Sequence, residues 1–209
     1  MVKSIAIVGG SSDIAKSTIS SMSADNYKFH VLVRDDSYTD ELSASGVSVV
    51  LGDATSEEDI KNFISGVKES GEIHAILHCV GSFAVRPPHA MNKEAFETVI
   101  STNLTSAFLT LSIAGKAMLS QGHGRMVFMS SVAGSLGLVN HEAISAAKGG
   151  IESMVRSAAA TYANRGLRIN AVAPGLTDTK LASPIMSNET ASQAASQKIP
   201  IKRVGQKEE

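Results

Sequence analysis

The chain has 209 residues, of which 43% are hydrophobic and 19% are charged, and these values exclude a disordered or fibrous protein and predict one globular domain. The formal net charge of −1 gives no electrostatic reason to expect a nucleic acid or an anionic membrane as partner. A single cysteine, Cys79, excludes an intrachain disulfide, and no spacing typical of zinc ligands is present, so we predict no metal site.

Six short β-rich runs alternate with longer helical patterns. The strands are expected at Ser4–Val8, Lys28–Val33, Val47–Leu51, Ile73–Cys79, Arg125–Ser130 and Arg168–Val172. The helices are expected at Ser12–Ala24, Ser56–Ser70, Asn92–Gln121 (as two helices) and Glu142–Asn164. This alternation predicts an α/β fold, with a doubly wound Rossmann-type parallel sheet and helices on both faces. Several strands are largely apolar, as expected of strands that are buried on both sides.

The two ends of the chain carry separate expectations. Residues 1–8 run directly into Gly9-Gly10, so we expect a first strand rather than a signal peptide. No apolar stretch reaches membrane-spanning length, so we expect a cytoplasmic protein with no membrane partner. After Pro174-Gly175 the pattern loosens, and we expect a mobile flap over residues 176–203 that contains one helix. The chain stops at Glu209 without a further strand, so we expect a single domain over residues 1–209.

The first strand–turn–helix carries a candidate phosphate-binding turn, Gly9-Gly10-Ser11-Ser12-Asp13-Ile14-Ala15. A turn of small residues lets backbone N–H groups approach a pyrophosphate at the positive end of a helix. Asp13 argues the other way, because an acid in the first helical turn stabilises the helix dipole but repels a phosphate. A helix cap that binds no ligand is therefore a serious alternative at this position.

Two charged residues follow the second strand. Dinucleotide sites place an acid there to hold the adenosine ribose, or an arginine to accept a 2′-phosphate. Arg34 stands directly after the strand and favours NADP over NAD, whereas Asp35 stands one residue too late. A solvated charge pair on a loop is the alternative interpretation of this segment.

Taken together, these segments resemble the short-chain dehydrogenase/reductase family over nearly the whole chain. The family's opening Thr-Gly-x-x-x-Gly-x-Gly falls on Val8, Gly9, Asp13 and Ala15, so only the first glycine is kept. The other matching segments are Asp53-Ala54 after the third strand, His78-Cys79-Val80-Gly81 at the family's Asn-Asn-Ala-Gly, Asn103 in the central helix, Ser131 after the fifth strand, Lys148 of the family's Tyr-x-x-x-Lys, and Pro174-Gly175 with Thr179 at its Pro-Gly-x-x-x-Thr.

The resemblance assigns chemical roles to these residues. In the family the serine hydroxyl, here Ser131, hydrogen-bonds the substrate oxygen where negative charge develops. The tyrosine is the general acid or base, and the lysine, here Lys148, lowers its pKa and holds the nicotinamide ribose. Asn103 is expected to support Lys148. The tyrosine position holds Ile144, which cannot transfer a proton.

His141 is the best candidate for a replacement proton donor. It stands three residues before Ile144, and residues i and i+3 share a face if the helix has already begun there. Histidine also has a pKa suited to proton transfer near neutral pH. The alternative is a surface histidine that flanks the helix. Glu142 is a weaker candidate, because two residues correspond to about 200° around a helix.

We therefore expect an NADP(H)-dependent oxidoreductase that acts on a small carbonyl/alcohol pair, with Ser131, Lys148, Asn103 and His141 as the catalytic residues. The cofactor site is assigned to Gly9, Ser11, Ser12, Asp13, Ile14, Arg34, Asp53, Ala54, Gly81, Lys148, Pro174, Gly175 and Thr179. The alternatives are a catalytically silent homologue that binds nucleotide as a sensor or structural partner, and chemistry that needs no protein proton donor. The resemblance also implies a homodimer or homotetramer through the Asn92–Gln121 and Glu142–Asn164 helices. Because family members continue with another helix and strand, we expect a chain that lacks the last helix and strand.

Overall fold

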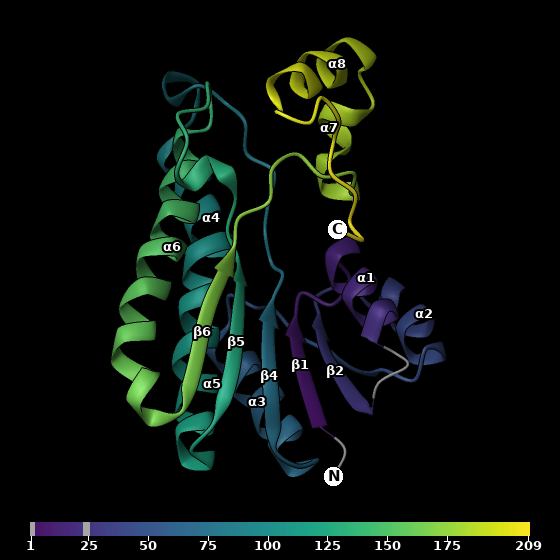
Figure 1. Cartoon of the computed structure of the whole chain (residues 1–209), viewed down its shortest axis with the longest axis vertical. Helices are drawn as coiled ribbons and strands as arrows, with labels where there is room; N and C mark the ends of the chain where they lie inside the picture. Colours follow the sequence, from purple (N-terminus) through teal and green to yellow (C-terminus); the bar gives the residue numbers. More distant parts are fainter. Residues whose placement is uncertain (1–2, 23–25) are drawn as a thin grey trace.

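The computed structural model describes residues 3–22 and 26–209, and its described part is built around one parallel sheet (Figure 1). The strands are β1 (Lys3–Val8), β2 (Tyr27–Val33), β3 (Ser48–Leu51), β4 (Ile73–His78), β5 (Gly124–Met129) and β6 (Leu167–Val172). They lie in the order β3-β2-β1-β4-β5-β6, and each pairs in parallel with its neighbours. The predicted doubly wound sheet is confirmed, and every strand lies within a few residues of its predicted bounds.

The strand order reverses between β1 and β4, which are neighbours in the sheet. Chain connections leave these two strands toward opposite faces, and a crevice is expected beyond their carboxyl ends. The turn after β1 and the loop after β4 start at this point. The topology therefore positions the first glycine turn and Gly81 side by side at the carboxyl ends of the central strands.

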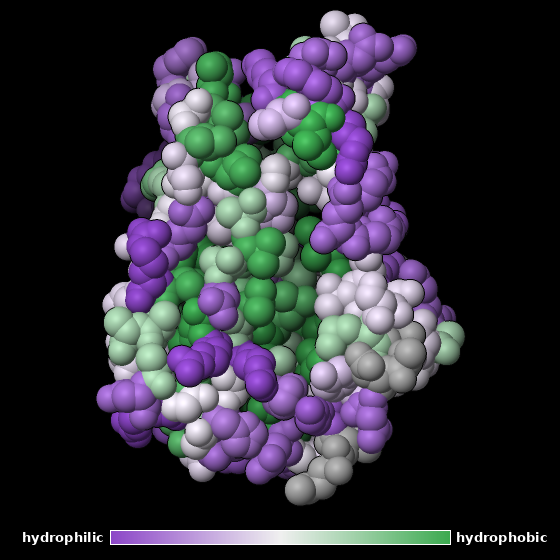
Figure 2. Space-filling model, viewed as in Figure 1, coloured by the Kyte–Doolittle hydropathy of each residue, from purple (hydrophilic) through white to green (hydrophobic). Residues whose placement is uncertain are grey.

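Helices cover both faces of the sheet. They are α1 (Asp13–Met22), α2 (Thr39–Ala44), α3 (Glu57–Glu69), α4 (Lys93–Ile100), α5 (Ser106–Gln121), α6 (Glu142–Tyr162), α7 (Ser183–Met186) and α8 (Glu189–Lys198). The helices α3, α5 and α6 bury their apolar faces in one core cluster, and α1 and α2 pack in a second cluster on the other face. Figure 2 shows further apolar surface over the middle of the sheet, between α6 and α1.

Local sequence signals explain where several helices begin and end. The hydroxyl of Ser56 accepts a hydrogen bond from the Asp59 backbone N–H at 3.2 Å, which caps the start of α3. Gly122 ends α5 with φ at 77°, a left-handed conformation that glycine adopts without steric cost. Both signals are readable from the sequence.

Two parts of the structure differ from the prediction. The short helix α2 was not predicted, because its six residues leave too few apolar positions to show a period. The flap contains two helices, α7 and α8, where one was predicted. The first helix was predicted to end at Ala24, which lies outside the described residues. The prediction of two helices over Asn92–Gln121 is confirmed only in part, because α4 and α5 follow one another without an intervening loop.

A π-helical turn, Ser101–Thr105, joins α4 to α5 into one continuous helix of 29 residues, Lys93–Gln121. By length and composition this helix is able to cross a membrane, which corrects the expectation that no stretch is long and apolar enough. Its buried side chains, among them Leu111, Ala114 and Met118, belong to the core beneath the sheet. The packing is that of the core helix of a globular domain.

Candidate active site

The turn after β1 needs its glycines for steric reasons. Gly9 has φ at 87°, and a Cβ at Gly10 would lie 2.5 Å from the Cβ of Val31. The backbone N–H groups of Gly9 and Gly10 both donate to the Leu32 carbonyl, at 3.0 and 3.1 Å. The turn is therefore held against β2, and Ser12 caps α1 by accepting from the Ala15 backbone N–H at 3.1 Å.

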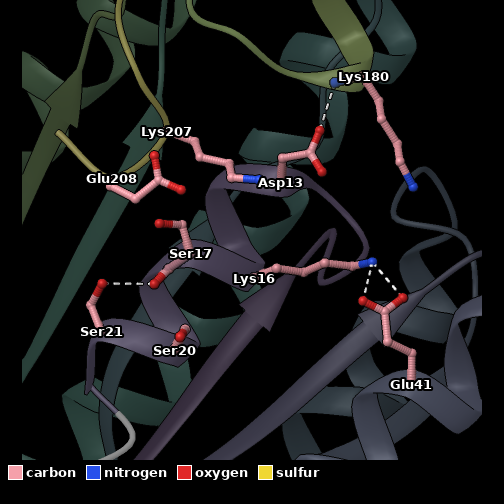
Figure 3. A pocket seen from close by; sticks show the side chains of 9 residues that line it. All are labelled: Asp13, Lys16, Ser17, Ser20, Ser21, Glu41, Lys180, Lys207 and Glu208. Carbon is pink, nitrogen blue, oxygen red and sulfur yellow. Dashed lines mark hydrogen bonds and ion pairs between the residues drawn. The ribbon is translucent and has the colours of Figure 1, made fainter.

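Asp13, the first residue of α1, contacts the flap. Its Oδ2 accepts a hydrogen bond from the Lys180 backbone N–H at 2.6 Å (Figure 3). One helical turn further, Lys16 pairs with Glu41 of α2 at 2.7 Å. Asp13 therefore has a structural task that the sequence did not reveal, because its partner lies 167 residues away.

The predicted adenosine side of the site is open to solvent. Arg34 is exposed after β2, and Asp35 accepts from the Ser37 backbone N–H at 2.9 Å, capping a short 3-10 turn. Asp53 Oδ1 accepts from both the N–H and the hydroxyl of Thr55, each at 2.7 Å. These two bonds hold the pKa of the Asp53 carboxyl below its ordinary value, and the positive charge of Arg34 contributes to the same shift.

Gly81, Asn103 and Lys148, which are widely separated in sequence, converge at one point. A Cβ on Gly81 would lie 3.4 Å from Asn103 Oδ1 and 3.6 Å from Lys148 Nζ. Asn103 is fully buried in the π-helical turn, where its Nδ2 donates to the Val99 carbonyl at 2.9 Å. Turns of this type leave a helical carbonyl without its usual donor, and they occur often at functional sites. The side chain of Asn103 supplies the donor.

Lys148 is a buried cation. Only 6% of its surface is exposed, and among the described residues its Nζ donates one hydrogen bond, to the Met129 carbonyl at 2.8 Å. Burial lowers the pKa of the ammonium to about 8. An ammonium carries three donors, so two N–H groups remain for a ligand near Gly81.

Ser131 and Ile144 occupy the positions at which the sequence predicted the reactive centre. Ser131 has an extended backbone, and its hydroxyl accepts from the Ala133 backbone N–H at 3.2 Å. The next residue, Val132, donates to the Pro174 carbonyl at 3.0 Å, which joins this loop to the segment after β6. Ile144 is 8% exposed and packs in an apolar cluster that includes Ala133.

His141 lies just outside α6, which begins at Glu142. The argument from a shared helical face therefore does not apply as stated. Its Nδ1 bonds the Val139 carbonyl at 2.7 Å, so this nitrogen carries the proton and a neutral ring keeps Nε2 as an acceptor. Among the described residues no hydrogen bond joins His141 to Ser131, and the catalytic role of His141 stays a prediction.

Two buried groups beside the site are chemically inert near neutral pH. Burial lowers the pKa of His78 to about 3, with a further contribution from the charge of Lys148, so the ring is neutral. Its Nε2 lies 3.1 Å from the hydroxyl of Ser106. Burial raises the pKa of the Cys79 thiol to about 12, as expected for an unreactive cysteine.

Two cavities flank the turn after β1. A polar cavity of about 460 Å³ lies along the outer face of α1 and contains Asp13 and Lys180 (Figure 3). A more apolar cavity of about 370 Å³ lies under the flap and brings together Ile14, Pro174 and Gly175. All three residues belong to the predicted cofactor site. The second cavity therefore brings together cofactor-site residues from near the start and near the end of the chain.

The sequence missed several residues that hold the site in place. Ser82 accepts from Asn103 Nδ2 at 2.8 Å, and its N–H donates to Asn103 Oδ1 at 3.2 Å. Glu152 accepts from the hydroxyls of Ser130 at 2.9 Å and Ser135 at 2.7 Å, which fastens the loop around Ser131 to α6. Ser82 follows Gly81 directly and was readable from its position, whereas Glu152 offered no such signal.

Comparisons with known proteins agree with this geometry. The family described as Enoyl-(Acyl carrier protein) reductase matches residues 9–209. The chain is 32% identical over 204 residues to the 3-oxoacyl-[acyl-carrier-protein] reductase MabA of Mycobacterium bovis, covering 97% of this chain and 80% of that protein. It is similar in structure to levodione reductase, with a TM-score of 0.94 and 25% identity over 100% of this chain and 87% of the other. It also resembles ElxO with NADP bound, with a TM-score of 0.92 and 24% identity over 100% and 88% of the two chains.

Proposed function

The chain belongs to the short-chain dehydrogenase/reductase family, a family of oxidoreductases, and we propose that it is an NADP(H)-dependent oxidoreductase that acts on a small carbonyl/alcohol pair. The observation that carries this proposal is the convergence of Gly81, Asn103 and Lys148. A buried ammonium with two unused donors beside a glycine suits a ligand rich in hydroxyl groups, such as the ribose of a nicotinamide nucleotide.

The residues around the switch point fit a dinucleotide. The small residues of the turn at Gly9 and Gly10 allow a pyrophosphate to approach the positive end of α1, and Arg34 offers a planar donor set for a 2′-phosphate. Asp53 and Gly81 would border the adenosine and ribose parts. Asp13 puts a carboxylate near the phosphates, and the Lys180 backbone N–H of the flap stabilises that charge. Relatives solved with NADP or NADPH bound support the choice of NADP.

The protein's own residues would then bind and polarise the substrate. When bound, NADP(H) supplies or accepts the hydride. The hydroxyl of Ser131 would donate to the substrate oxygen, and Lys148 would hold the ribose with its two unused donors. With Ile144 at the tyrosine position, we assign proton transfer to His141 Nε2, which the bond from Nδ1 to the Val139 carbonyl leaves open: Nε2 of the neutral ring would accept the alcohol proton, and the imidazolium would return it to the carbonyl oxygen.

The test is a titration of the purified protein with NADPH and, separately, with NADH, in which nicotinamide fluorescence reports binding. A panel of carbonyl substrates is then assayed for turnover. We expect tight NADPH binding and weak NADH binding, and Arg34→Ala should weaken NADPH binding roughly tenfold or more while leaving NADH binding unchanged. Exposed Arg168→Ala, at the start of β6, is the matched control. If neither nucleotide binds the folded protein, the proposal is wrong.

A second function, a nucleotide-binding homologue without catalytic activity, is favoured by one observation. Ile144 is packed in an apolar cluster, so the position of the general acid is filled by a side chain that serves the core. NADPH binding together with an absence of turnover in both the natural protein and His141→Ala would support this function. Carbonyl reduction by the natural protein that falls when His141 is replaced would exclude it.

Assembly and location are also proposals. Phe96 on α4 and Phe108 on α5 are large exposed apolar side chains on one continuous helix, which supports a homodimer or homotetramer through α4, α5 and α6. Sedimentation equilibrium of Phe108→Ser against the natural protein tests this assembly. We expect a small-molecule substrate, no nucleic acid partner and a cytoplasmic location.

A further inference from the structure

Two loops beside Ser131 expose an unusual set of large apolar side chains. Single exposed apolar residues are normal on a protein surface, but a contiguous group marks a binding surface. The group consists of Phe83 at 40% exposure, Val85 at 38%, Leu136 at 57%, Leu138 at 37% and Val139 at 81%. We call these five residues the apolar rim.

The two loops of the rim are fastened to each other. The Arg86 backbone N–H donates to the Asn140 carbonyl at 2.8 Å, which joins the loop after β4 to the loop after β5. Within the loop after β5, the Leu136 backbone N–H also donates to the Val132 carbonyl at 2.8 Å. The five side chains therefore belong to one surface rather than to two unrelated ones.

Both loops also start at the candidate active site. One leaves Gly81 and Ser82, which border Lys148 and Asn103. The other leaves Ser131, whose carbonyl accepts from Gly134 N–H at 2.8 Å. The rim is thus continuous along the chain with the two segments that carry the predicted chemistry.

The base between the two loops is apolar as well. Ala84 packs against the buried cluster that contains Ala133 and Ile144. The polar phenol that the family places at position 144 is replaced here by a hydrocarbon side chain. Figure 2 shows apolar surface at the upper left, where Figure 1 places these loops, and a second apolar patch facing it from the flap segment, in which Ile201 is exposed.

We propose that the apolar rim binds the hydrocarbon part of the substrate, so that the enzyme acts on neutral ketones or secondary alcohols with an alkyl chain or apolar ring. This inference rests on the proposed function and adds its substrate class. The occupant is a small molecule because the rim is continuous with Ser131 and with the apolar base at Ile144. A polyhydroxylated or charged substrate would leave the five side chains in water.

The test uses a series of straight-chain 2-ketones from butan-2-one to nonan-2-one. Binding is measured by ligand-observed NMR, in the presence and absence of NADPH, and turnover is measured by NADPH oxidation. Each added methylene should raise affinity and kcat/KM by up to about fourfold until the rim is filled. A glucose-derived polyol and a short keto acid serve as polar comparison compounds and should bind without this gain.

Val85→Ser and Val139→Ser shorten the rim without touching the residues assigned to chemistry. Both should flatten the gain per methylene and leave NADPH binding unchanged. Val50→Ser is the matched control, because Val50 has the same 38% exposure as Val85 but lies on the edge strand β3. Circular dichroism of all three variants verifies that they are folded.

The outcomes separate this inference from the proposed function. NADPH binding and turnover without any dependence on chain length would refute the apolar rim and leave the oxidoreductase intact. Chain-length-dependent ketone binding without NADPH binding would support the rim and refute the oxidoreductase. If Val139→Ser instead changes the sedimenting mass and leaves ketone binding unchanged, a second copy covers the rim and the inference is wrong.

Discussion

Replacing Lys148 with methionine should stabilise the protein at neutral pH. The lysine is buried and its pKa falls from 10.5 to about 8, so the native state disfavours the ammonium. A shift of this size corresponds to a cost of roughly 3 kcal/mol at pH 7, from which the lost hydrogen bond to Met129 subtracts about 1 kcal/mol. Methionine has a similar length and no charge, so we expect a net gain of about 2 kcal/mol.

The pH dependence identifies the cause. The unfolded lysine titrates near 10.5 and the native one near 8, so the unfolded state binds more protons between these values and the natural protein gains stability as the pH rises through them. The difference in unfolding free energy between Lys148→Met and the natural protein should therefore narrow by roughly 2 kcal/mol between about pH 7 and pH 10. Urea unfolding at the two pH values measures it, with exposed Lys116→Met on α5 as control. A difference that does not change with pH would refute the argument from burial.

Three further changes test the site. Ile144→Tyr should exceed Ile144→Phe in carbonyl reduction by roughly 10²–10⁴-fold, because the two overpack the same cluster and only one adds a proton donor; equal rates would contradict this. Asp13→Ala should speed hydrogen exchange at the Lys180 amide roughly tenfold or more, because that amide loses its carboxylate acceptor; unchanged exchange would mean that the contact does not hold the flap. Glu152→Ala should lower the unfolding free energy by about 1 kcal/mol in urea titrations, because the Ser135 hydroxyl loses its acceptor and the Ser130 hydroxyl keeps only the Lys148 carbonyl at 3.2 Å; Glu152→Gln should lose less stability.

Most of the fold was predictable because its signals are local. Apolar runs such as Ile73–Cys79 show a buried strand, and a hydroxyl at Ser56 or a glycine at Gly122 marks a helix end. The short helix α2 and the second flap helix were not predictable from the sequence. Each has fewer than three turns of mixed composition, which show no clear hydrophobic periodicity. The sequence also could not show that one face of the apolar 29-residue helix packs in the core of the domain.

The sequence named candidate site residues but could not show their contacts. Gly81, Asn103 and Lys148 were named from the family resemblance, and the structure brings these three residues together. The bond from the Lys180 backbone to Asp13 was not predictable, because it depends on where the flap folds back in space. The predicted start of α6 at Glu142 is confirmed, and it leaves His141 outside the helix, so the argument that His141 and Ile144 share a helical face does not apply.

Ile144 and Lys148, the two buried side chains of the candidate centre, have opposite effects on the stability of the fold. Ile144 sits well in an apolar cluster, so its presence needs no functional explanation. Lys148 does need one, because a buried ammonium with a single hydrogen bond among the described residues destabilises the fold, and a methionine would fill the same space at lower cost. Binding of a polar ligand at Gly81 accounts for the buried charge, because oxygen atoms of the ligand would accept from the two remaining N–H groups of the ammonium. Nucleotide binding is therefore the part of the function that the buried charge supports most directly, and it can be measured even if turnover is absent.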